Sequence, residues 1–176
     1  FCLSRGLGDV YKRQVFYKGT NLFNLYYFTT GPQQMKDIRY VQLTDGKVGV
    51  FSRPRGEEIR KKYGSEAVIG FTVLNSINEL DADVVEQATA IEGVFGRDEW
   101  GGCNQCLLLE NGKIGVIGHG CYNEFDGTIN QLVYTNIAFV FDPETFQVSD
   151  LKMIGTRKSY PTGEGKKPNL ADCVFT

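Results

Sequence analysis

Residues 37–51 read DIRYVQLTDGKVGVF, and residues 103–117 read CNQCLLLENGKIGVI. The two stretches lie 66 residues apart (103 − 37 = 66), and their centres DGKVGV and NGKIGV superpose without a gap. An Asp-Gly or Asn-Gly pair between alternating apolar runs is the strongest short-range signal of a β-hairpin, because both turn positions favour positive φ. The sequence therefore predicts two copies of one hairpin.

Further strands are predicted after each hairpin. AVIGFTVL at 67–74 follows the first copy, TNIAFVFD at 135–142 follows the second, and LKMIGTR at 151–157 supplies a more polar fourth strand. Each unit is then an antiparallel meander of three or four strands, which is typical of a β-propeller blade. The alternative is a β-sandwich in which two hairpins happen to share similar turns.

The remaining segments extend this pattern. VFYKGTNLFNLYYFT at 15–29 is predicted to form the outer strands of a preceding blade, and ADCVFT at 171–176 a third inner strand. RGEEIRKKYGSE at 55–66 is expected to be a charged loop. Capping-box spacing from Ser76 to Glu79 predicts the start of a short helix. Because a closed propeller needs about four blades or more, we predict a fragment of a larger one.

Both ends of the chain bear on the domain prediction. Residues 1–14, FCLSRGLGDVYKRQ, resemble a translated sequencing-adapter read-through, so we expect them to be an artefact outside the fold. The chain opens on Phe1 and stops at Thr176 inside a predicted strand. We therefore expect a partial β-propeller domain over residues 15–176, truncated at both ends.

Composition narrows the function classes. The 176 residues carry a net charge of −2 with 41% hydrophobic residues, which indicates a globular core and no basic excess for nucleic acid. No apolar run approaches the roughly 18 residues of a membrane helix, so no membrane partner is expected. The sequence also contains no Gly-rich phosphate loop, Ser nucleophile elbow or HExxH motif.

Five cysteines are present, one of them, Cys2, in the excluded leader. CNQC at 103–106 has the spacing of a redox or metal half-site, but positions i and i+3 of a strand face opposite sides. We therefore expect buried free thiols, which favour a reducing compartment and a cytoplasmic location, and we predict no metal site.

Asp37 and Arg39 stand two residues apart at the start of the first predicted inner strand, and so on one side of it. In a propeller that strand end lies at the pocket, where a carboxyl shielded from cations can act as a general acid. A structural Asp-Arg ion pair that closes the strand end is the alternative interpretation.

The equivalent strand of the second copy follows RDEWGGCNQ at 97–105. Asp98, Glu99, Trp100 and Asn104 combine carboxylate, aromatic and amide groups, which is typical of a sugar site, and the two glycines let backbone approach a ligand. The alternative is a solvated acidic loop with Trp100 as core filler.

His119, the single histidine, occupies the repeat position of Arg53 (53 + 66 = 119). Both residues follow the second strand of their unit, so we expect them on one rim near Arg39. Such a group of cationic side chains suits a phosphate or carboxylate ligand. Alternatively, each residue caps its hairpin in water.

The segments GPQQMKDIRYVQLTDGKVGVFSRPRG, DEWGGCNQCLLLENGKIGVIGH and KKPNLADCVFT occur in this order along the chain. Together with other motifs between them, they resemble the bacterial family called domain of unknown function 1861, from about residue 30 to the end. That family is similar to five-bladed β-propeller glycosidases, especially the mannoside phosphorylases and hydrolases of glycoside hydrolase family 130. The resemblance implies an all-β, five-bladed propeller, of which this chain holds about two full blades plus flanking strands, and it implies sugar chemistry.

The resemblance also implies individual roles. In the mannoside phosphorylases the Asp of a Glu-Asp-Pro-Arg motif donates a proton, and residues 36–39 match it at Asp37 and Arg39 but depart at Lys36 and Ile38. The His of their Tyr-His-Gly motif helps to hold phosphate, and His119 matches it within Gly-His-Gly.

The sequence thus predicts a carbohydrate-active enzyme, either a glycoside hydrolase or a phosphorylase acting on mannoside-like substrates, which is inactive as this fragment. No cofactor is expected, inorganic phosphate is left open as a co-substrate, and a homo-oligomer is left open. The alternative is a non-catalytic propeller that binds carbohydrate or protein. The expected catalytic residues are Asp37 and Glu99, and the expected substrate-binding residues are Arg39, Arg53, Asp98, Trp100, Asn104 and His119.

Overall fold

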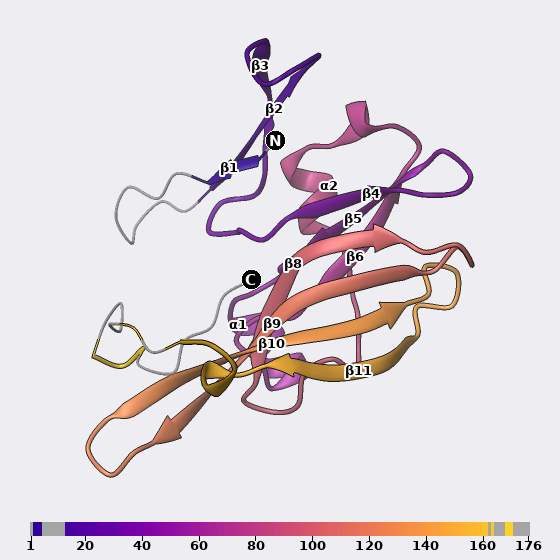
Figure 1. The fold of residues 1–176 in the computed structure, drawn as a ribbon. Helices are drawn as coiled ribbons and strands as arrows, with labels where there is room; N and C mark the ends of the chain where they lie inside the picture. Colours follow the sequence, from indigo (N-terminus) through magenta and orange to yellow (C-terminus); the bar gives the residue numbers. More distant parts are fainter. Residues whose placement is uncertain (1, 5–12, 162, 164–167, 171–176) are drawn as a thin grey trace.

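The structure is a computed structural model that describes residues 2–4, 13–161, 163 and 168–170, and it contains three antiparallel sheets (Figure 1). The N-terminal sheet comprises β1 (Cys2–Ser4), β2 (Gln14–Gly19) and β3 (Leu25–Thr30). The central sheet comprises β4 (Arg39–Gln42), β5 (Val48–Ser52), β6 (Gly70–Leu74) and β7 (Thr89–Ala90). The C-terminal sheet comprises β8 (Trp100–Leu108), β9 (Ile114–Phe125), β10 (Asn130–Phe141) and β11 (Val148–Gly155).

The chain is mostly β-sheet, as the all-β prediction expected. The central and C-terminal sheets are both four-stranded meanders whose strands follow chain order, and β4 of one lies against β8 of the other (Figure 1). The predicted strand at 171–176 lies outside the described residues. No helix in the described part of the chain has the length and apolar character needed to cross a membrane.

Both predicted hairpin turns form, and they share one hydrogen-bond pattern. Leu43 N donates to Lys47 O at 2.8 Å and Gly46 N to Leu43 O at 3.0 Å, and the second copy repeats both bonds from Leu109 and Gly112. Only the glycine of each pair has positive φ, 85° at Gly46 and 79° at Gly112. The turns are therefore three-residue turns with a bulged glycine, which corrects the expectation of positive φ at both positions of each pair.

The repeat continues into the strand pairing. Arg39 lies opposite Phe51, and the residues 66 positions later, Gln105 and Ile117, also lie opposite each other. Beyond that pair β8 has a register shift between Cys103 and Gln105, so Asn104 is the extra residue of a β-bulge. One extra residue reverses the alternation of side chains, so Cys103 and Cys106 face the same side. The prediction that they face opposite sides is wrong.

Helical segments occupy the loops of the central unit. Residues 55–66, expected to be a loop, contain α1 (Glu57–Tyr63), whose first turn carries Glu57 and Glu58 and whose last turn is basic. This charge order suits the helix dipole. The helix predicted near Ser76 is the short 3-10 turn η1 (Ile77–Glu79), and α2 (Ala82–Glu86) follows it. A second 3-10 turn, η2 (Arg157–Ser159), follows β11.

Two apolar clusters hold the sheets together. The larger joins the central and C-terminal sheets through Phe51, Phe71 and Phe141, with ring centroids 4.8 to 5.7 Å apart. The smaller cluster includes Phe16 of the N-terminal sheet and Val50 of the central sheet. These contacts fix β4 beside β8, where the candidate site lies.

Gln14 links the N-terminal sheet to the loop before β4. This residue is the last of the stretch set apart as an artefact, yet its side chain is buried within β2. Its amide nitrogen donates to Ile38 O at 2.8 Å, and its amide oxygen accepts from Ile38 N at 3.0 Å. The side chain therefore satisfies both backbone groups of Ile38, next to Asp37.

Candidate functional site

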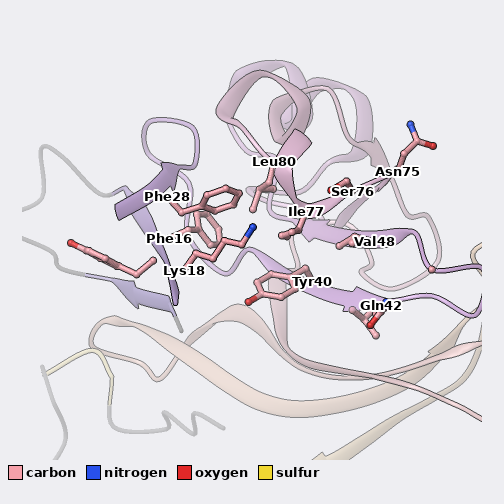
Figure 2. Close-up of a pocket in the computed structure, with 13 residues that line it drawn as sticks. Phe16, Lys18, Phe28, Tyr40, Gln42, Val48, Asn75, Ser76, Ile77 and Leu80 are labelled. Atoms are coloured by element: carbon pink, nitrogen blue, oxygen red, sulfur yellow. The ribbon is translucent and has the colours of Figure 1, made fainter. Parts of the chain in front are cut away.

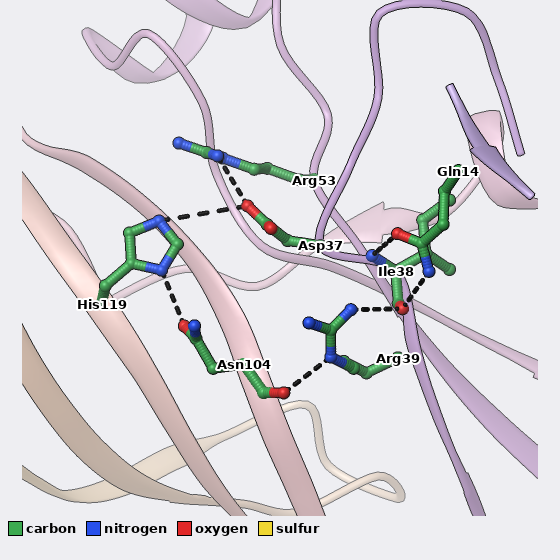
Figure 3. Close-up of polar contacts among 7 residues, drawn as sticks. All are labelled: Gln14, Asp37, Ile38, Arg39, Arg53, Asn104 and His119. Atoms are coloured by element: carbon green, nitrogen blue, oxygen red, sulfur yellow. Dashed lines mark hydrogen bonds and ion pairs between the residues drawn. The ribbon is translucent and has the colours of Figure 1, made fainter. Parts of the chain in front are cut away.

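Asp37 lies at the centre of a polar cluster between β4, β5, β8 and β9 (Figure 3). Its backbone is left-handed with φ 63°, a conformation that Asp and Asn tolerate better than most residues. The preceding Met35 and the following Ile38 are both buried, and Gln14 holds Ile38. The fold therefore fixes the carboxylate of Asp37 inside the cluster, with 15% of its side chain exposed.

The two repeat-equivalent residues, Arg53 and His119, converge on one oxygen of that carboxylate. Arg53 NH1 lies 2.6 Å from Asp37 Oδ2, and His119 Nε2 lies 4.0 Å from the same atom. Both side chains are buried, which excludes the alternative in which they cap hairpins in water. His119 also lies inside β9 rather than after its strand, because β9 continues to Phe125.

The bulge in β8 places Asn104 between His119 and Arg39. Oδ1 of Asn104 lies 2.7 Å from His119 Nδ1, and its backbone oxygen accepts from Arg39 Nε at 2.6 Å (Figure 3). Arg39 NH1 donates to Ile38 O at 2.9 Å. With Oδ1 as acceptor, His119 carries its proton on Nδ1. The bulge thus orients two of the groups that surround Asp37.

The cluster carries a net positive charge. Burial, followed by the positive charge of Arg53, lowers the pKa of His119 from 6.5 to about 4. The imidazole is therefore neutral at pH 7, and two guanidinium groups and one carboxylate give +2 − 1 = +1. Arg53 Nε is buried and has no hydrogen-bond partner among the described residues. The arrangement suits an anionic ligand.

Acidification is expected to destabilise the protein through His119. His119 takes up a proton near pH 6.5 in the unfolded state but only near pH 4 in the folded state. Its contribution to the free energy of unfolding is therefore fully present above pH 6.5 and is lost as the pH falls to 4. The shift corresponds to about 3 kcal/mol. Urea unfolding across this range should be steeply pH-dependent in the wild type and flatter in His119→Gln. Equal slopes would contradict a buried neutral imidazole.

Gly102 of β8 makes room for Asp37. A Cβ atom at this position would lie 3.0 Å from Asp37 Oδ2 and 3.3 Å from Arg53 Cδ. A Cβ at Gly101 would lie 2.0 Å from His119 O. The double glycine was expected to let backbone approach a ligand; in this structure it lets β8 pack against the ion pair and against β9.

An aromatic surface borders the cluster on the same face of the C-terminal sheet. Gly102 pairs with His119 and Trp100 with Cys121, and directly opposed residues of antiparallel strands share a face. Trp100 therefore lies on the Asp37 side, about 7 Å along the strand from Gly102. Tyr134 pairs with Cys121 on the other side, and its ring centroid is 5.9 Å from that of His119.

Asp98 and Glu99 are not brought to Asp37. The side chain of Asp98 is 83% exposed and lies near Arg97. Glu99 is exposed, and its Oε2 accepts a hydrogen bond from Gly96 N at 2.7 Å, which closes the loop before β8. Three residues of extended chain separate Glu99 from Gly102, which is about 10 Å.

A separate cavity of about 530 Å³ lies between the N-terminal sheet and β4 (Figure 2). Phe16, Phe28, Tyr40 and Leu80 line it, and Lys18 extends into it. Lys18 donates to Asn78 at 2.9 Å and lies 5.2 Å from the centre of the Phe28 ring. Because no carboxylate lines this cavity, the acid–base chemistry of the described residues is better placed at Asp37.

The sequence analysis did not predict that Gln14 and Tyr134 border the site, or that Gly102 lies beside Asp37. Tyr134 could have been placed next to His119 only with knowledge of how β9 pairs with β10. That pairing was not predictable because β9 is longer than expected. Among the described residues, no group of three or more His, Cys, Asp or Glu side chains could hold a metal ion.

The fold and site define an all-β protein with a cationic, carboxylate-containing cluster where two repeated sheets meet. The chain belongs to the family described as protein of unknown function, DUF1861, which it matches over residues 7–176. No curated protein matches it.

Solved structures resemble the chain closely. MPT-4, a mannose phosphorylase from Leishmania mexicana in complex with phosphate ion, is 44% identical with a TM-score of 0.85 over 98% of this chain and 52% of its own. A hypothetical protein from Leishmania major is 47% identical with a TM-score of 0.78, over 93% and 49%. MPT-1, a GDP-Man-dependent mannosyltransferase from Leishmania mexicana, is 36% identical with a TM-score of 0.82, over 99% and 53%. The chain spans about half the length of these proteins.

Proposed function

We propose that the full-length protein is a carbohydrate-active enzyme that transfers a mannosyl group between a sugar and inorganic phosphate. The observation that carries this proposal is the net positive cluster of Arg39, Arg53 and neutral His119 around Asp37. Similarity to a mannose phosphorylase bound to phosphate supports the substrate class. The similarity to a mannosyltransferase supports mannosyl as the group that is transferred.

Phosphate would bind against the cationic side of the cluster. Arg53 Nε is a buried donor with no partner among the described residues, and the guanidinium of Arg39 is held in place by Asn104 O and Ile38 O. Charge-assisted bonds from guanidinium groups to phosphate are strong and geometrically specific. His119 would contribute a neutral hydrogen-bonding group rather than a charge.

Asp37 would deliver a proton to the glycosidic oxygen as that oxygen leaves. In the proposed step a phosphate oxygen bonds to the anomeric carbon and the glycosidic C–O bond breaks. The Asp37 carboxylate takes up the proton of the bound monohydrogen phosphate and passes it to the leaving oxygen. Positioned acid catalysis of this kind contributes typically about 10²- to 10⁴-fold. The products are mannose 1-phosphate and the shortened sugar.

Among the residues that the structure describes, the positions of the acidic side chains favour phosphorolysis over hydrolysis. A hydrolase needs a second carboxylate about 5 to 9.5 Å from the first. Glu99, the expected second carboxylate, instead caps the turn at Gly96, about 10 Å along the chain from Gly102. A phosphate anion held by cations takes the place of that carboxylate and its water. Glu99 and Asp98 therefore have no catalytic role in the proposal.

The sugar would stack on the aromatic surface beside the cluster. Trp100 and Tyr134 flank Cys121 on the face that carries His119, and aromatic rings pack against the C–H faces of sugars. For the fold as a whole, we propose that the central and C-terminal sheets are neighbouring blades of a five-bladed β-propeller, with β4 and β8 as inner strands. The adjacency of these two strands supports the arrangement.

The test is product analysis with the full-length protein on β-mannosides, with and without phosphate, and with GDP-mannose as a separate donor. We expect mannose 1-phosphate to form only when phosphate is present. The 176-residue chain should bind phosphate by calorimetry but should not turn over substrate. Free mannose released without phosphate would indicate a hydrolase, and transfer only from GDP-mannose a transferase. Binding of sugar without any turnover would indicate a non-catalytic protein.

A further inference from the structure

Cys103 and Cys106 form a thiol pair that the proposed reaction does not use. Cys103 lies opposite Gly118 and Cys106 opposite Val116, so the bulge at Asn104 leaves them only two rungs apart on one face. Two rungs of strand correspond to about 6.6 Å between Cα atoms, within the range of about 4.4 to 6.8 Å found in disulfides. Neither residue is in a disulfide in this structure.

The two thiols differ in the way that a reactive pair requires. Cys103 is completely buried, and Cys106 is half-buried with its Sγ 3.5 Å from Tyr40 O on β4. A hydrogen bond between the two thiols raises the pKa of Cys103 and lowers that of Cys106, and the positive charge of Arg39 also favours the Cys106 thiolate. A more exposed thiolate beside a buried thiol is the usual arrangement of a nucleophile and its resolving partner.

We propose that Cys103 and Cys106 are a reversible dithiol–disulfide site that responds to small-molecule disulfides such as oxidised glutathione. The Cys106 thiolate attacks one sulfur of the glutathione disulfide and releases one glutathione thiolate. Cys103 then loses its proton and attacks Cys106 Sγ, which expels the second glutathione. Two protein thiols are oxidised and one glutathione disulfide is reduced to two thiols.

The position of the pair connects it to the polar cluster. Asn104, the bulged residue between the two cysteines, contacts His119 through its side chain and Arg39 through its backbone oxygen. A disulfide between Cys103 and Cys106 would draw the two sides of the bulge together and move Asn104, which lies between them. We expect oxidation to weaken phosphate binding about tenfold, as loss of one charge-assisted hydrogen bond would do. This consequence rests on the proposed function, whereas disulfide formation does not.

The experiment uses the tryptic peptide 98–113, which contains Cys103 and Cys106 and no other cysteine. The native protein is incubated with oxidised glutathione, alkylated, digested and analysed by mass spectrometry. We expect this peptide to lose two hydrogen atoms and take up no alkyl group, and dithiothreitol to restore two alkylation sites. Cys106→Ser should abolish the change, and Cys121→Ser, which alters a buried cysteine of β9, should not.

A second measurement follows the cluster without relying on activity. His119 is the single histidine, so its imidazole nitrogen signals in NMR of the untagged protein are unambiguous. Oxidation should shift the Nδ1 signal in the wild type and leave it unchanged in Cys106→Ser. Two alkylated cysteines, or glutathione retained on Cys106, would overturn the proposed disulfide. A disulfide that forms while phosphate affinity stays constant would overturn its link to the cluster and leave the proposed function intact.

Discussion

Asp37→Asn is expected to lower phosphate-dependent turnover of the full-length protein by about 10²- to 10⁴-fold, the usual contribution of a positioned general acid. An amide cannot donate the proton that the leaving oxygen needs. The fold should survive, because Asn tolerates the left-handed backbone at φ 63° and its amide oxygen can still accept from Arg53. Phosphate binding should be unchanged or tighter, because the net charge of the cluster rises from +1 to +2.

Asp98→Asn is the matched control for this variant. Asp98 has nearly the same backbone conformation, with φ 62°, but its side chain is 83% exposed and lies outside the cluster. Turnover by the Asp98→Asn variant should equal turnover by the wild type. Steady-state kinetics with varied phosphate would separate the effect on kcat from the effect on KM. If Asp37→Asn kept full activity, Asp37 would have no part in the proton transfer.

Phe71→Ala should destabilise the protein by about 3 to 5 kcal/mol, the range measured for removal of a buried phenyl ring. Phe71 is 1% exposed, and its ring centroid lies 4.9 Å from that of Phe51 and 4.8 Å from that of Phe141. It also covers Gly49, where a Cβ atom would lie 2.8 Å from the ring. The ring therefore packs within the central sheet and against the C-terminal sheet, and the cavity left by alanine would weaken both contacts.

The midpoint of urea unfolding would measure this loss, with Phe23→Ala as the control. Phe23 is 98% exposed, so its removal should change the stability by no more than about 0.5 kcal/mol. If the alanine variant fails to fold, Phe71→Leu should show a smaller loss of the same sign. A loss below about 1 kcal/mol for Phe71→Ala would contradict a core shared by the two sheets.

The repeat was predictable because it depends on local signals. Asp45-Gly46 and Asn111-Gly112 between alternating apolar runs place both hairpins, and the strands that follow were predicted near their observed positions. The helix α1 was missed because it has no buried residue, and hence no apolar periodicity to reveal it. Its ion pairs, such as Lys61 with Glu58 at 3.2 Å, lie on an exposed surface.

The site was predictable in part for the same reason. Offsetting the sequence by 66 residues aligned Arg53 with His119, and the structure brings both to Asp37. The bulge at Asn104 was not predictable, because an extra residue in a strand depends on how the partner strand pairs. Missing it produced the wrong prediction for the faces of Cys103 and Cys106. The long β9, which places His119 within a strand, depends likewise on its pairing with β10.

Gln14 has a practical consequence for expressing shortened versions of this protein. A boundary drawn after residue 14, where the adapter-like stretch ends, would remove the side chain that satisfies both backbone groups of Ile38. The turn that carries Asp37 would then lose its attachment to β2. A start codon placed before Gln14, with room for β2 to pair along its full length, keeps that attachment, so the cloning boundary itself determines whether the carboxylate is held in place.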